Sequence, residues 1–246
     1  DDDIHELLKN MNFSGEYKEI RIFYSNSKLV ALGGLGETKK LTSQKVRTVQ
    51  KEVIQDIDNL ICSSVIIHPA SAKAIHIQAQ IESLYEMNYE YKKKGDLFRN
   101  VFIPVSPFVQ KRIQKMIKPA QSIMEEIKKC RDLINQPGNE LNPASFESYI
   151  KKNSYSDVKC TVYDAAALNK IGLKLLTSVS LGSKYPARLV QLEYNPTKKK
   201  EVDCCLIGKG VTFDSGGMDL KTSSSHKFMK SDMAGAATSL AVIQTL

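Results

Sequence analysis

The sequence lacks any long apolar run, and no stretch approaches the roughly 18 apolar residues that a membrane-spanning helix requires. It also lacks a basic-then-apolar leader, because its first residues, Asp1 to Asp3, are acidic. We therefore expect a soluble, cytoplasmic protein with no membrane partner. A targeting segment removed before residue 1 stays compatible with this start.

Histidine is scarce, and the cysteines show no pairing pattern. The chain has 4 histidines and 5 cysteines, an odd number, without C-x-x-C pairs or histidines at zinc-finger spacing. This argues against a disulfide framework and against a cysteine-histidine zinc site, and it favours buried thiols in a reducing compartment. The cysteines are Cys62, Cys130, Cys160, Cys204 and Cys205.

Complete nucleotide-binding motifs are missing as well. The run Gly33 to Gly36 lacks the G-x-G-x-x-G spacing and reads as a glycine turn. The pair Gly208-Lys209 resembles the end of a phosphate loop, but that loop needs Gly where Cys204 stands and Ser or Thr where Gly210 stands. These departures argue against a nucleotide-hydrolysing protein.

The charge balance is basic, with 35 Lys and Arg against 27 Asp and Glu and a net charge of +8. The excess is mostly dispersed lysine, and its two short clusters, residues 92–94 and 198–200, fall where turns are expected. We interpret them as solvated faces. Binding of a polyanion such as nucleic acid is the less favoured alternative.

What is present is an α/β pattern. The composition, 42% hydrophobic and 25% charged in 246 residues, suits a globular chain of one large or two ordinary domains. Alternating strand-like and helix-like stretches predict a small α/β domain over residues 1–118. The strands are expected at residues 18–25, 29–33, 64–67 and 100–105, the third of them buried, and the helices at residues 46–60 and 71–94.

A connecting helix is predicted at residues 119–134, because Pro119 is tolerated near a helix start or at a kink. A second, incomplete α/β domain follows at residues 135–246, with a capped helix after Asn142-Pro143 and a mixed central sheet flanked by helices. Its strands are expected at residues 158–163, 189–194 and 204–207. The last is a continuous apolar run, typical of a strand buried on both faces, and functional residues are expected just beyond its end.

The segment beyond that run carries the chemistry. It contains Lys209, Asp214, Lys221 and Asp232, separated by glycines and small polar residues that allow close backbone approach. Carboxylates are hard ligands for divalent ions, and a bridging carboxylate could hold two ions roughly 3.5–4 Å apart. A lysine there could ligate a metal as the neutral amine or stabilise an oxyanion as the ammonium. Taken alone, this spacing is also compatible with an ordinary charged loop.

The same segment closely resembles the signature of the leucyl (cytosol) aminopeptidase family. The resemblance lies in residues 208–217 (GKGVTFDSGG), 220–221, Met229 and 232–237 (DMAGAA), and it preserves the family's spacings between the four charged residues. Upstream, residues 131–143 resemble the entry into the family's catalytic domain. The resemblance is clear over residues 119–246. In the first domain it rests only on the alternation of predicted strands and helices.

The resemblance implies a role for each of these residues. Lys209 and Asp232 would ligate one metal ion and Asp214 would contact both, so that Asp214 and Asp232 also bind the substrate. Lys221 would stabilise the tetrahedral intermediate, and Met229 would line the pocket for a Leu-like or Met-like N-terminal side chain. The implied cofactors are two divalent ions, zinc or manganese first, with cobalt or magnesium as alternatives.

One departure from the family pattern matters. The family's second signature, an Asn-Thr-Asp-Ala-Glu-Gly-Arg run, is absent, so three of the five expected metal-contacting side chains are present. We expect residues 1–246 alone to be inactive and to bind metal weakly. The resemblance implies peptide substrates and a homohexamer. A polyanion-binding protein and a non-catalytic structural member of the family are the alternative hypotheses.

Overall fold

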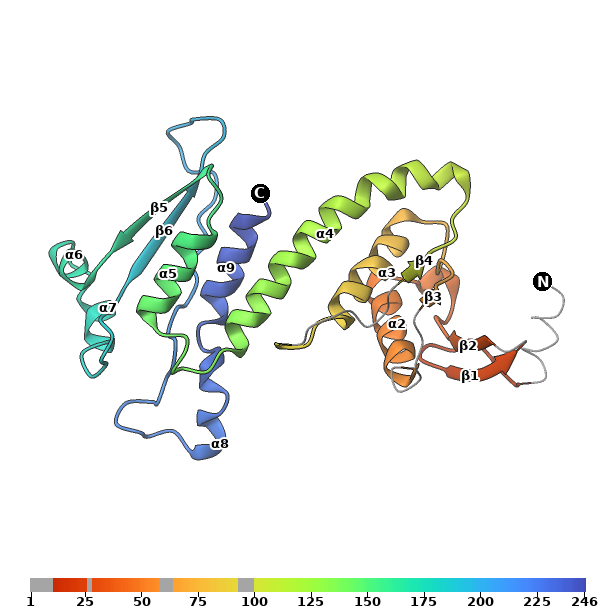
Figure 1. Cartoon of the computed structure of the whole chain (residues 1–246), viewed down its shortest axis with the longest axis horizontal. Helices are drawn as coiled ribbons and strands as arrows, with labels where there is room; N and C mark the ends of the chain where they lie inside the picture. The colour runs from red at the N-terminus through yellow and green to blue at the C-terminus, as the bar shows by residue number, and fades with distance from the viewer. Residues whose placement is uncertain (1–10, 26–27, 58–63, 93–99) are drawn as a thin grey trace. The chain divides into compact units, whose positions relative to one another are not determined.

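The computed structural model describes residues 11–25, 28–57, 64–92 and 100–246. It divides the chain into two compact units, residues 1–124 and 125–246. The division falls inside the long helix α4 (Pro107–Asn135), so that the first part of α4 belongs to one unit and the last part to the other (Figure 1). The sequence-based assignment of residues 1–118, 119–134 and 135–246 to functional domains stays a prediction.

The first unit combines a hairpin, a short parallel strand pair and helices. Strands β1 (Ile20–Ser25) and β2 (Lys28–Gly33) pair antiparallel. A 3-10 turn, η1 (Thr38–Lys40), precedes α2 (Ser43–Ile57) and α3 (Ala74–Met87), which pack on each other. Strand β3 (Ser64–Ile66) pairs in parallel with β4 (Asn100–Phe102).

The apolar period predicted α2 correctly. Val46, Val49 and Ile57 are buried on one face of the helix, as a 3.6-residue repeat requires, whereas Leu60 lies outside the described residues. The prediction that residues 64–67 form a buried strand is wrong in one respect. The strand exists, but successive side chains point to opposite faces, so that Val65 is half-buried whereas Ile66 is 63% exposed.

The second unit contains α5 (Pro143–Asn153), β5 (Val158–Tyr163), α6 (Ala165–Lys170), α7 (Lys174–Val179) and β6 (Leu189–Tyr194). These are followed by α8 (Ser223–His226), η2 (Met229–Ser231) and α9 (Ala234–Gln244). Strands β5 and β6 pair antiparallel, with Val158 opposite Tyr194. The predicted cap of α5 is confirmed, because the Asn142 side chain accepts from the amides of Ala144 and Ser145.

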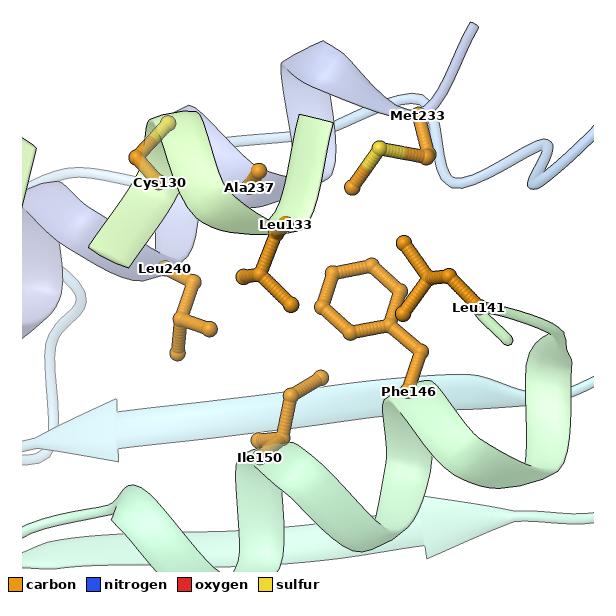
Figure 2. Close-up of a cluster of buried hydrophobic side chains, with 8 residues drawn as sticks. All are labelled: Cys130, Leu133, Leu141, Phe146, Ile150, Met233, Ala237 and Leu240. Carbon is orange, nitrogen blue, oxygen red and sulfur yellow. The ribbon is translucent and has the colours of Figure 1, made fainter. Parts of the chain in front are cut away.

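The core of this unit lies between the end of α4, α5 and α9 (Figure 2). The side chains shown there are at most 9% exposed, and partly buried residues of β5 and β6 pack against them. They are Cys130, Leu133, Leu141, Phe146, Ile150, Met233, Ala237 and Leu240. Because Met233 is fully buried directly after Asp232, this core fixes one end of the candidate site.

Two sequence-based predictions about this unit are wrong. Residues 204–207 form no strand, and Leu206 and Ile207 are 54% and 93% exposed. An apolar run becomes a buried strand only where other strands flank it, and in the described part of the chain β5 and β6 pair only with each other. For the same reason the expected mixed central sheet is replaced, over the described residues, by separate two-stranded sheets.

The predicted start of the connecting helix also needs correction. Helix α4 begins at Pro107, well before Pro119, which lies inside the helix. Pro107 suits a first helical position, where the backbone N–H that proline lacks would have no partner within the helix. Among the described helices, none is both long and apolar enough to cross a membrane.

Candidate metal and peptide site

The loop that carries Lys209 lies directly against the first turn of α9. The Ala236 amide donates to the Lys209 carbonyl at 2.9 Å. A Cβ atom on Gly208 would lie 2.5 Å from the Cα of Ala236 and 2.6 Å from the carbonyl oxygen of Gly235. Only glycine allows this approach. Gly208 in the loop and Gly235 in α9 therefore let the two segments pack closely, which brings Lys209 next to Asp232.

Lys209 and Asp232 form an ion pair. The Lys209 Nζ donates to Asp232 Oδ1 at 2.7 Å, and the Asp232 side chain is 18% exposed. Its other oxygen, Oδ2, is buried and finds no hydrogen-bond partner in the part of the chain that the structure describes. The hydrogen bond to Asp232 raises the pKa of Lys209 above its usual value, with smaller contributions from the charges of Asp232 and Asp214.

Asp214 and Lys221 form a second ion pair, in which Lys221 Nζ donates to Asp214 Oδ2 at 2.7 Å. The other carboxylate oxygen of Asp214 accepts from the Gly216 amide at 2.8 Å, and Gly216 has a φ of +82° that favours glycine. The bond from Lys221, followed by that from the Gly216 amide, lowers the pKa of Asp214 below its usual range. Lys221 Nζ also lies 2.9 Å from Met229 Sδ.

The two pairs are neighbours. The charge of Lys209 helps to lower the pKa of Asp214, and that of Asp214 helps to raise the pKa of Lys209. The structure therefore brings together all five residues named from the sequence, Met229 included through its contact with Lys221. Their roles in binding and catalysis stay predictions.

The donor set fits divalent cations in part. Two carboxylates offer hard ligands, one of them with a buried oxygen that has no partner among the described residues, and the lysine amines add nitrogen donors. No group of three or more His, Cys, Asp or Glu suited to a metal occurs within the described ranges. Two carboxylates neutralise the charge of one dication, so a two-ion site needs further acidic ligands.

His226 lies beside this loop without joining the four charged residues. Its Nε2 is 3.2 Å from Asp219 Oδ1, and its ring centroid is 6.0 Å from that of Phe213. These contacts suit a structural role for His226 in the loop.

The sequence analysis did not single out Lys230. Its Nζ donates to the carbonyl oxygen of Asn135, the last residue of α4, at 3.1 Å. A lysine is common at a surface, and a contact between residues so far apart in the chain leaves no local signal in one sequence.

Comparison with known proteins gives a consistent result. Two models of the same family match the chain, the cytosol aminopeptidase N-terminal domain over residues 1–94 and the cytosol aminopeptidase catalytic domain over residues 128–246. A probable cytosol aminopeptidase of Chlamydia abortus is 31% identical over 251 residues, which cover 94% of this chain and 50% of the relative. One of Phytoplasma mali is 40% identical over 134 residues, 54% of this chain and 27% of the relative.

Solved structures share the fold. The bottromycin maturation enzyme BotP in complex with Mn superposes with a TM-score of 0.78 at 26% identity, covering 98% of this chain and 52% of BotP. A mutant of tomato leucine aminopeptidase superposes with a TM-score of 0.78 at 22% identity, covering 99% of this chain and 49% of the tomato chain. The chain thus spans about half the length of the curated relatives and solved structures that it matches over nearly its whole extent.

Proposed function

Because the chain belongs to the cytosol aminopeptidase family, we propose that it supplies part of the active site of a metal-dependent enzyme that releases N-terminal amino acids from peptides. The observation that carries the proposal is the convergence of two carboxylates and two lysine amines at one place. Each acid lies 2.7 Å from a lysine, and the two pairs influence each other's pKa.

Lys209, Asp214 and Asp232 would hold the metal ions, with Asp214 touching both. Asp232 Oδ2 is buried and accepts no hydrogen bond from the residues that the structure describes, which supports this role, because such an oxygen is an open ligand position. Zinc and manganese are the first choices, and a Mn complex of the related BotP favours manganese, whereas cobalt and magnesium are alternatives. When bound, the ions supply Lewis acidity at the scissile carbonyl and activate water.

The lysines divide two tasks. Lys209 keeps its ammonium while Asp232 raises its pKa, and it would become a neutral nitrogen ligand next to dications, which disfavour a nearby positive charge. Lys221 would remain an ammonium and donate to the oxyanion that forms on the substrate carbonyl. Its contacts with Asp214 and Met229 fix the position of its Nζ.

Met229 and the two acids would select the substrate. The thioether of Met229 lies next to Lys221 Nζ, so an apolar N-terminal side chain of the Leu or Met type would pack there close to the reacting carbonyl. With metal ions held by Asp214 and Asp232, the site would favour a substrate with a free amino terminus, because a free amine can ligate a metal ion whereas an internal peptide nitrogen is a poor ligand. Both preferences agree with an enzyme that acts on chain ends.

Residues 1–246 alone are proposed to be inactive and to bind metal weakly, because two carboxylates cannot balance two dications. For the active enzyme we propose peptide substrates, a cytoplasmic location and a homohexameric assembly, as is typical of the family.

Mn²⁺ titration of the 246-residue chain, followed by the electron paramagnetic resonance of free Mn²⁺, tests the site. Asp214→Asn and Asp232→Asn should each raise the Kd at least about 10-fold, because each removes a ligand charge. Asp203→Asn removes an equal charge from a side chain that is 82% exposed and should leave the Kd within about 2-fold. Equal effects of all three substitutions, or none, would refute a metal site here.

A second assay tests the inactivity of the chain. Hydrolysis of leucine p-nitroanilide by residues 1–246, with added Mn²⁺ or Zn²⁺, should stay at the level of the metal alone. Robust turnover that disappears in Asp232→Asn would show that the chain needs no further ligands.

A further inference from the structure

One turn contacts both chain segments that carry an acid of the candidate site. It consists of residues 135–138 at the end of α4, and we call it the α4 turn. Its Asn135 carbonyl accepts from Lys230 Nζ at 3.1 Å. Its Gly138 faces Phe213, because a Cβ on Gly138 would lie 3.3 Å from Phe213 Cδ2 and 3.5 Å from Phe213 Cβ. These two contacts reach two separate loop segments of the site.

Each contact is made one or two residues from an acid of the site. Phe213 directly precedes Asp214. Lys230 is the middle residue of η2 and lies two residues before Asp232. The Asp232 amide donates to the Met229 carbonyl at 3.2 Å. A displacement at either contact is therefore passed on to a carboxylate through a very short stretch of backbone.

The chemistry of the Lys230 contact suits an anchor. Carbonyl groups at the end of a helix carry partial negative charge, which favours a lysine ammonium, and α4 ends at Asn135. Lys230 is half-buried, so this bond is less screened than a bond at the surface. On the other side of Asp232, Met233 is fully buried in the core. Asp232 is thus held between two fixed neighbours.

We infer that the α4 turn positions both acids of the site, and that Lys230 is a positioning residue that acts through Asp232 and Met229. Its role in metal binding rests on the proposed function, whereas its role in fixing η2 does not. Lys230 touches neither acid in the contacts described above, so its effect is on placement and not on ligation.

Three variants separate this role from a general effect of charge. Lys230→Gln removes the ammonium, and Lys230→Arg restores a cationic donor to the Asn135 carbonyl. Lys227→Gln is the matched control, since Lys227 is exposed and its Nζ lies 5.3 Å from the centroid of the Phe228 ring, away from the acids of the site in the contacts that the structure describes. Thermal unfolding of each variant identifies any loss of the fold.

The first measurement uses the metal-free chain. Amide hydrogen exchange, resolved by NMR, reports on the amides of Asp232 and Ala236, which donate to the carbonyls of Met229 and Lys209. Lys230→Gln should accelerate both about 10-fold, and Lys230→Arg and Lys227→Gln should stay within about 2-fold of the unaltered chain. Equal exchange in Lys230→Gln and Lys227→Gln would overturn the inference.

The second measurement is the Mn²⁺ Kd, which Lys230→Gln should raise about 10-fold, in the range known for residues that orient metal ligands. Lys230→Arg should restore it. If the unaltered chain binds Mn²⁺ but Lys230→Gln leaves the Kd unchanged while exchange accelerates, Lys230 is structural only and the positioning role is wrong. If the unaltered chain binds no Mn²⁺, the proposed metal function fails, and the exchange result alone decides whether Lys230 fixes η2.

Discussion

The close approach of Gly208 to α9 predicts a sharp difference between two glycines. In Gly208→Ala the new Cβ would lie 2.5 Å from the Cα of Ala236, a backbone atom that cannot move aside as a side-chain end can. In Gly210→Ala the new Cβ would meet only the Cβ of Ala236, at 3.6 Å, which is an ordinary contact. The two substitutions make the same chemical change two residues apart.

The expected size follows from the contacts that are lost. Overpacking of a tight site costs about 1–3 kcal/mol, and the hydrogen bond from Ala236 to the Lys209 carbonyl contributes about 1 kcal/mol. Gly208→Ala should therefore lower the free energy of unfolding by about 2–4 kcal/mol. Gly210→Ala should leave it unchanged or raise it by up to about 1 kcal/mol, since alanine restricts the unfolded chain.

Urea unfolding followed by far-ultraviolet circular dichroism measures this difference, with the slope of each transition compared to confirm that both variants expose the same surface. Metal-free protein is used, so that the result depends on packing alone. Equal stability of the two variants would refute the argument that the 208–209 segment lies against α9.

Three further predictions concern pH, thiol reactivity and nucleic acid. The hydrogen bond from Lys151, followed by that from Arg188, lowers the pKa of Glu147 below its usual 4.5. The ionised carboxylate therefore stabilises the fold above pH 4.5, and this contribution is lost as the pH falls through the folded-state pKa. Glu147→Gln should thus cost about 0.5–1 kcal/mol in urea unfolding at pH 7 and progressively less as the pH falls below 4.5, and a cost that does not change with pH would contradict this. Burial raises the pKa of the Cys130 thiol, so Ellman's reagent should modify exposed Cys205 well before Cys130. Peptide mass spectrometry can establish the order of modification. Reaction of Cys130 first would show that it does not lie in the core. With a net charge of +8 spread over the chain, binding to duplex DNA in a mobility-shift assay should be weak and vanish between about 50 and 200 mM salt, whereas binding that persists would favour the polyanion hypothesis.

Local signals in the sequence predicted local structure well. The cap formed by Asn142 is readable because a capping residue and its helix are adjacent, and the apolar period of residues 46–57 indicates which face of α2 is buried. The resemblance to a family signature singled out four charged residues of one segment, and the structure shows that they form two ion pairs, which the sequence had not indicated.

Long-range pairing was beyond the sequence. Residues 204–207 have the composition of a buried strand, but burial depends on neighbouring strands, which the residues themselves do not specify. The Lys230 contact with Asn135 was invisible for the same reason. Pro119 shows the opposite error, since a strong local rule placed it near a helix start and the surrounding turns of α4 override that rule.

The bond between the Ala236 amide and the Lys209 carbonyl has a consequence for thermodynamic linkage. A ligand that bridges Lys209 and Asp232 should also stabilise the first turn of α9 against fraying. By linkage, a solvent condition that frays this turn should weaken the binding of the ligand by the same coupling free energy. Occupancy of the site and the stability of the first turn of α9 are therefore coupled equilibria.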